Sequence, residues 1–115
     1  MNFWRKWKGA TITKLSPREV HQRLQAESPP LILDVRQGVE IQSGIIPGAM
    51  HIPLTQLSQR LAEIPRDRPV ICVCYSNHRS PIAARLLAKA GYEVLDMREG
   101  MLGWARAGLP LSHAD

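Results

Sequence analysis

The chain has 115 residues, of which 44% are hydrophobic and 22% are charged, a composition typical of one soluble globular domain. No apolar run approaches the ~18 residues of a membrane-spanning helix, and no secretory leader pattern follows Met1, so we expect a cytoplasmic protein. The two cysteines, Cys72 and Cys74, alternate along one predicted strand. They are poorly placed to bridge each other, which argues against a disulfide-stabilised secreted domain.

The formal net charge of +5 is concentrated at the N-terminus, where residues 1–23 hold six basic side chains and one acidic one. We predict a basic, aromatic tail at residues 1–10, a folded domain at 11–111 and a frayed C-terminal tail at 112–115. The N-terminal tail could contact an anionic membrane surface weakly through Phe3, Trp4 and Trp7. Packing of these side chains on the domain is favoured, because so short a tail buries little area, and we expect no nucleic-acid partner.

Predicted strands and helices alternate along the domain. A strand at 11–15 is followed by a helix that begins with a capping box and a proline, Ser16-Pro17-Arg18-Glu19. Further strands are predicted at 31–35, 49–52, 70–73 and 92–97, and further helices at 54–64, after residue 80, and at 100–107. This order predicts an α/β fold, a parallel sheet with helices on both faces.

The central strand runs into a polar loop that begins at Cys74. In such sheets the functional crevice lies outside the carboxyl ends of the strands. Ser80-Pro81 predicts a helix start, with the serine at N-cap and the proline at N1. Loop N–H groups, the helix dipole and Arg79 would stabilise a thiolate, the form of cysteine that acts as a nucleophile. We interpret the loop as an anion cradle with a nucleophile at its lip; the alternative is an ordinary buried thiol.

Four motifs, in order and together covering about residues 11–111, resemble those of rhodanese-type sulfurtransferases. They are Asp34-Val35-Arg36, then 44–49 with Ile52-Pro53, then Cys74 with Arg79-Ser80, and finally 100–104 with 108–110. The resemblance implies the rhodanese-like fold, with five parallel strands and helices on both faces.

The chain departs from the family pattern at three positions. Asn77 and Glu99 replace usual glycines, and Ile45 replaces a usual histidine. Asparagine tolerates a positive φ better than most residues, so we expect the loop to close.

The resemblance implies an enzyme, a thiosulfate sulfurtransferase. It would move a sulfane sulfur from thiosulfate or a persulfide donor to cyanide or a thiol through a persulfide on Cys74. Neither a metal nor a cofactor is implied. The implied partners are a small sulfur-containing donor and a thiol acceptor, with a sulfur-relay protein as a further candidate. In this interpretation Cys74 is catalytic, while the other site residues bind substrate (Tyr75, Ser76, Asn77, His78, Arg79) or support the site (Asp34, Arg36, Ser80).

Several alternatives stay open. Arg79 either binds the donor or pairs with a carboxylate such as Asp34, and Glu40 is expected to be solvated. Cys72 is more readily an inert core cysteine than a relay thiol. A cysteine-dependent phosphatase or arsenate reductase is disfavoured because only four residues separate Cys74 from Arg79, fewer than in phosphatase loops. A non-catalytic interaction module is disfavoured by the presence of Cys74.

Overall fold

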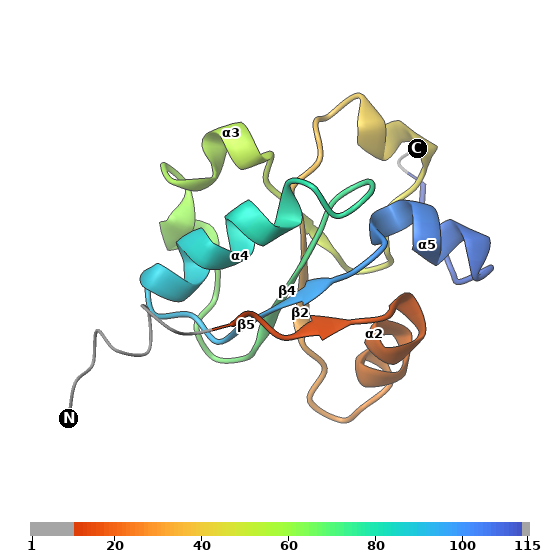
Figure 1. Cartoon of the computed structure of the whole chain (residues 1–115), viewed down its shortest axis with the longest axis horizontal. Coiled ribbons are helices and arrows are strands. Elements are labelled where there is room, and N and C mark those ends of the chain that lie inside the picture. The colour runs from red at the N-terminus through yellow and green to blue at the C-terminus, as the bar shows by residue number, and fades with distance from the viewer. Residues whose placement is uncertain (1–10, 114–115) are drawn as a thin grey trace.

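The computed structural model describes residues 11–113. Five parallel strands form one sheet in the order β1-β5-β4-β2-β3 (Figure 1). The predicted fold class is therefore confirmed. The strands are short and span the residues β1 Lys14–Leu15, β2 Leu31–Asp34, β3 Met50–His51, β4 Val70–Val73 and β5 Val94–Met97.

The helices cover both faces of the sheet (Figure 1). The α-helices are α2 Pro17–Leu24, α3 Leu54–Leu57, α4 Ser80–Lys89 and α5 Gly100–Arg106, with 3-10 turns η1 at Glu40–Ser43 and η2 at Leu61–Glu63. The predicted capping box is present at α2, where Ser16 and Glu19 exchange backbone and side-chain hydrogen bonds of 2.8 and 3.1 Å.

The central strand β4 is buried on both faces. Val70 and Cys72 pack in the cluster beneath α3 and α4, whereas Ile71 and Val73 pack in the cluster on the side of α2 and α5. A strand covered on both faces needs apolar side chains at consecutive positions. This arrangement accounts for the uninterrupted apolar run that marked the strand in the sequence.

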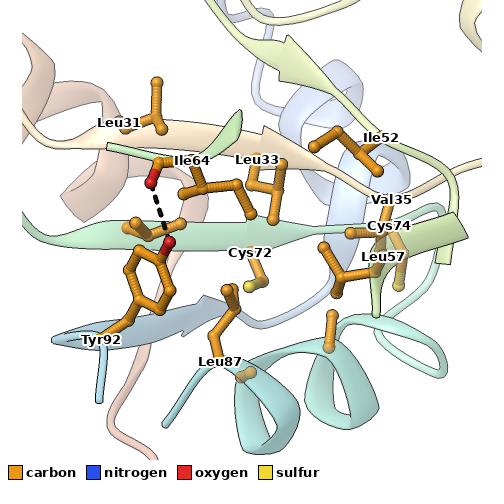
Figure 2. Close-up of a cluster of buried hydrophobic side chains, with 13 residues drawn as sticks. Leu31, Leu33, Val35, Ile52, Leu57, Ile64, Cys72, Cys74, Leu87 and Tyr92 are labelled. Carbon is orange, nitrogen blue, oxygen red and sulfur yellow. Dashed lines mark hydrogen bonds between the residues drawn. The ribbon is translucent and has the colours of Figure 1, made fainter. Parts of the chain in front are cut away.

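The predicted helix at 54–64 is wrong beyond its first turn. The chain leaves the α-helix after Leu57 and forms η2 instead. The hydroxyl of Tyr92 donates to the carbonyl oxygens of Leu61 and Ile64, at 2.9 and 2.8 Å, and Figure 2 shows the second of these bonds. The apolar spacing indicates correctly that Leu57 and Ile64 are buried. The carbonyl oxygens of Leu61 and Ile64, however, bind Tyr92, a contact between distant segments that the spacing does not reveal.

The N-terminal tail, with Phe3, Trp4 and Trp7, lies outside the described residues, so its contacts remain a prediction. The predicted fraying of residues 112–115 is wrong at Ser112, whose backbone exchanges two hydrogen bonds of 2.8 and 2.9 Å with Ile45; residues 114 and 115 lie outside the described residues. Between residues 11 and 113 no helix has the length and apolarity to cross a membrane; a cytoplasmic location remains a prediction.

Two residues other than glycine adopt a positive φ in the described part of the chain, Asn77 at 71° and Glu99 at 67°. Both stand where the family pattern has glycine. The left-handed conformation costs a residue with a Cβ about 1–2 kcal/mol. Asparagine tolerates it through local hydrogen bonds, whereas glutamate has no such advantage, so Glu99 is a strained position.

We expect Glu99→Gly to raise the free energy of unfolding by about 0.5–1 kcal/mol, because relief of the strain exceeds the entropy that glycine adds to the unfolded chain. Urea denaturation measures the change. Glu93→Gly is the matched control, since Glu93 is exposed and has no positive φ; it should lower stability. Equal losses in the two variants would show that Glu99 is not strained.

Candidate active site

The loop of residues 74–79 joins β4 to α4 at the carboxyl end of the sheet. Cys74 follows β4 directly and lies on the same side of the strand as Cys72, facing α4 (Figure 2). Both thiols are free and fully buried. The prediction of a nucleophile at the lip of the loop is therefore wrong: Cys74 lies at its base, packed near Val35 and Leu57 (Figure 2).

Ser80 is the polar neighbour of the Cys74 sulfur. Its Oγ lies 3.4 Å from Cys74 Sγ and is itself buried. The prediction that Ser80 is the N-cap of α4 is wrong. Arg79 occupies that position, Ser80 is the first helical residue and Pro81 is the second. The Ser80 hydroxyl is directed at the sulfur and at Asn77 rather than at the first turn of the helix.

The first peptide groups of the loop are oriented by the start of α5. Met101 N–H donates to the Cys74 carbonyl at 2.8 Å, and Leu102 N–H donates to the Tyr75 carbonyl at 3.0 Å. In a trans peptide the N–H points opposite to the C=O, so the N–H groups of Tyr75 and Ser76 point away from α5. Among the residues that the structure describes, none accepts a hydrogen bond from the backbone N–H groups of 75–79. The N–H groups of Tyr75 and Ser76 are therefore donors turned away from α5 and without an acceptor in the described part of the chain.

Arg79 is paired with Glu40, the first residue of η1. Two hydrogen bonds of 2.6 and 2.8 Å join its guanidinium to the two carboxylate oxygens, a bidentate geometry that adds strength and direction. The prediction that Glu40 is solvated is wrong, and the partner of Arg79 is Glu40 rather than Asp34. These bonds lower the pKa of Glu40 to about 2, against an opposing effect of burial. They also raise the pKa of Arg79.

Asp34 and Arg36 form a second ion pair that does not contact Cys74. Arg36 Nη2 lies 2.7 Å from Asp34 Oδ2 and also donates to the Gly44 carbonyl at 2.8 Å, with both side chains buried. The Arg36 carbonyl accepts from His51 Nε2 at 2.7 Å. This pair fixes the segment that presents Glu40 to the loop. A supporting role for Asp34 and Arg36 remains a prediction.

The other loop side chains differ in direction. Tyr75 and His78 are exposed, and His78 Nδ1 lies 2.9 Å from Ser76 Oγ. The side chain of Asn77 points inward to Asp96, at 2.8 Å. Of the predicted substrate-binding residues, three therefore lie near the surface, one points into the domain and Arg79 is paired with Glu40.

The sequence analysis missed Glu40 and Asp96. Asp96 is a buried carboxylate in β5 whose neighbours Leu95 and Met97 are apolar. A single charged residue within an apolar strand is the signal by which it could have been found. Glu40 gave no such signal, because it lies in a polar segment 39 positions from Arg79.

Cys72 has the character of a core thiol. Burial raises its pKa well above the usual value, and the charges of Asp96 and Cys74 raise it further. Asp96 is its neighbour across the β4–β5 ladder. Cys72 is therefore held in the protonated form.

A cavity of about 210 Å³ lies beside the loop, where Tyr75, Met101 and Leu102 form part of its lining. Cys74 does not line it. Within residues 11–113 no group of three metal-ligating side chains comes together.

A family model described as "Rhodanese-like domain" matches residues 16–107, and the chain belongs to this family. A protein named Sulfurtransferase from Allochromatium vinosum is 38% identical over 101 residues, which are 87% of this chain and 94% of that protein. A protein named Thiosulfate sulfurtransferase GlpE from Actinobacillus pleuropneumoniae is 30% identical and covers 90% of this chain and 96% of its own length. The crystal structure of a rhodanese-like domain protein from Staphylococcus aureus has a TM-score of 0.82 at 25% identity and covers 90% of this chain and 100% of its own.

We expect the Glu40 carboxyl to be still ionised at pH 4.5, where an ordinary glutamate is half protonated, because Arg79 lowers its pKa to about 2. A lowered pKa in the folded state stabilises the protein above 4.5, and this contribution is lost as the pH falls toward 2. NMR titration of the carboxyl carbon measures the midpoint. In Arg79→Gln it should return toward 4.5; the same midpoint in both proteins would show that Arg79 is not the cause.

We expect Gly100→Ala to displace the loop, since a Cβ on Gly100 would collide with the backbone of Tyr75 and Cys74. Gly108 has a similar φ, 69° against 61°, with open space around it, so Gly108→Ala reports backbone strain alone. The extra loss of unfolding free energy at Gly100 should be about 1–3 kcal/mol, the cost of overpacking. Urea denaturation of the two variants measures it, and equal losses would mean that this contact does not hold the loop.

Proposed function

We propose that this protein moves a sulfane sulfur from thiosulfate or a persulfide donor to a thiophilic acceptor through a persulfide on Cys74. The observation that carries the proposal is the loop itself: it begins at the buried Cys74, and the backbone N–H groups of residues 75–79 have no acceptor in the described part of the chain. Successive N–H groups that surround one point bind anions, and the proposal assigns this role to these groups at the sulfur of Cys74. The family's relatives named sulfurtransferases support the same reaction type.

The first step is the attack of the Cys74 thiolate on the outer sulfur of thiosulfate. A new S–S bond forms at Cys74, the S–S bond of thiosulfate breaks, and sulfite leaves with the electron pair. The persulfide carries its negative charge on the outer sulfur, where the loop N–H groups are donors. In the second step an acceptor such as cyanide or a thiolate attacks that sulfur, and Cys74 leaves as a thiolate. Neither step needs a cofactor.

Ser80 and Arg79 have different roles in this scheme. The Ser80 hydroxyl, 3.4 Å from the sulfur, donates to Cys74 whenever it is a thiolate, both before the first step and after the second. Arg79 lies close enough for a charge on Cys74 to raise its pKa, but Glu40 already neutralises its guanidinium. The backbone amides therefore carry most of the anion stabilisation.

The burial of Cys74 sets a requirement for the reaction. A donor reaches the sulfur only after the side chains that bury it move. The same burial, with the pairing of Arg79 and Glu40, favours a second candidate, a non-catalytic interaction module. A phosphatase is less well supported, because four residues between Cys74 and Arg79 make a small loop and Arg79 is already bonded to a carboxylate.

The acceptor in the cell belongs to the same proposal. A small thiol or a protein cysteine can take the sulfur, and a sulfur-relay protein is a further candidate partner.

Treatment with thiosulfate should add one sulfur, about 32 Da, to the intact protein, and a thiol should remove it. The added mass should be absent in Cys74→Ser and present in Cys72→Ala, which removes the buried second cysteine and leaves the loop intact. Intact-mass spectrometry makes the measurement. A persulfide donor serves as a second substrate; no added mass with either donor would favour the interaction module.

A further inference from the structure

The side chain of Asn77 joins the loop to three other elements. Its amide nitrogen lies 3.0 Å from Ser80 Oγ, 2.8 Å from Asp96 Oδ2 and 3.1 Å from the Met97 carbonyl. Its Oδ1 accepts from Lys14 Nζ at 2.8 Å. Two N–H bonds thus serve three acceptors at α4 and β5, while the oxygen faces an ammonium on β1.

These neighbours fix the orientation of the Asn77 amide. A carboxylate and a carbonyl accept hydrogen bonds only, and an ammonium donates only. The reverse orientation would direct the amide oxygen at Asp96 and the amide hydrogens at Lys14. Asn77 therefore donates to Ser80.

This donation determines what the Ser80 hydroxyl can do. A hydroxyl has one hydrogen and two acceptor sites. One lone pair of Ser80 Oγ accepts from Asn77, and while Cys74 is a thiol the other accepts from its S–H, with Sγ and Oγ 3.4 Å apart. When Cys74 is a thiolate, the sulfur can only accept, so Ser80 donates to it.

Asp96 anchors Asn77 from beneath. It is fully buried, and its Oδ2 binds Asn77 and Lys14 Nζ, the latter at 3.2 Å. Its Oδ1 has no hydrogen-bond partner among residues 11–113. Burying a carboxylate with one oxygen unpaired costs free energy. The hydrogen bonds of the other oxygen to Asn77 and Lys14 offset this cost and hold the Asn77 side chain in place.

We infer that Asn77 is a positioning residue for the proposed sulfur transfer: anchored by Asp96 and Lys14, it aims the Ser80 hydroxyl at Cys74 Sγ and thereby stabilises the thiolate. The inference rests on the proposed function. A glycine, which the family pattern has at this position, has no side chain for this contact, so the device belongs to this chain. It acts before the first step, when the thiolate attacks, and in the second, when the thiolate leaves.

The rate of alkylation of Cys74 by iodoacetamide as a function of pH tests the inference, because it reports the thiolate without requiring sulfur transfer. Asn77→Gly accepts the positive φ of the loop and removes only the side chain. Since the Ser80 hydroxyl then loses the contact that holds it toward the thiolate, and a hydrogen bond to a charged group is weakened, the midpoint of the profile should rise by about one pH unit, and alkylation below the midpoint should slow about tenfold. Peptide mapping assigns the label to Cys74.

A double-mutant cycle separates positioning from a structural role. If Asn77 acts through Ser80, Asn77→Gly should shift the midpoint in the unaltered protein but not in Ser80→Ala. Glu99→Gly, the same replacement at the other positive φ, should leave the midpoint unchanged. An unchanged midpoint in Asn77→Gly, or an equal shift in the presence and absence of the Ser80 hydroxyl, would overturn the inference.

The two proposals fail in different ways. Thermal unfolding confirms that each variant is folded, and Ser80→Gly takes the place of Ser80→Ala in the cycle if the latter does not fold. If the coupled shift is observed but the protein takes up no sulfur, the role of Asn77 stands and the proposed sulfur transfer is overturned. If the protein takes up sulfur but the shift is absent, the sulfur transfer stands and the role of Asn77 is overturned.

Discussion

Two hydrogen bonds between the start of α5 and the loop that follows β4 determine the orientation of the candidate site. They hold the carbonyls of Cys74 and Tyr75 toward Met101 and Leu102 and so turn the following N–H groups the other way. Gly100 permits this approach because any side chain there would meet the loop backbone. The C-terminal motif at residues 100–104 therefore holds the loop backbone in place through its own backbone.

Side chains then hold the loop from two directions. Glu40 binds Arg79 at the outer edge, and Asp96 binds Asn77 on the inner side. Both anchors are carboxylates, and each engages donors that would otherwise be free to meet an incoming anion. The backbone amides are left as the principal donors of the loop. This arrangement favours the binding of a single sulfur atom over the binding of a phosphate, which would require a free guanidinium.

The sequence predicted those features that depend on neighbouring residues. The capping box at Ser16, the buried strand β4 and the tolerance of Asn77 for a positive φ all follow from local chemistry, and the parallel sheet follows from the order of elements. The features that failed depend on tertiary contacts. The ion pair of Glu40 joins segments 39 positions apart. The predicted helix at 54–64 ends at Leu57, and carbonyls of the segment that follows bind Tyr92. The burial of Cys74 results from the packing of several elements at once.

The two thiols, two positions apart and on the same side of the sheet, have different environments. Burial and the nearby carboxylate keep Cys72 protonated, whereas Cys74 begins the loop and has the Ser80 hydroxyl 3.4 Å from its sulfur. Oxidation of a cysteine by peroxide requires both thiolate character and exposure. Cys72 is therefore protected from peroxide in two ways, and a movement of the loop that opens a path to Cys74 exposes that sulfur to peroxide as well as to a sulfur donor.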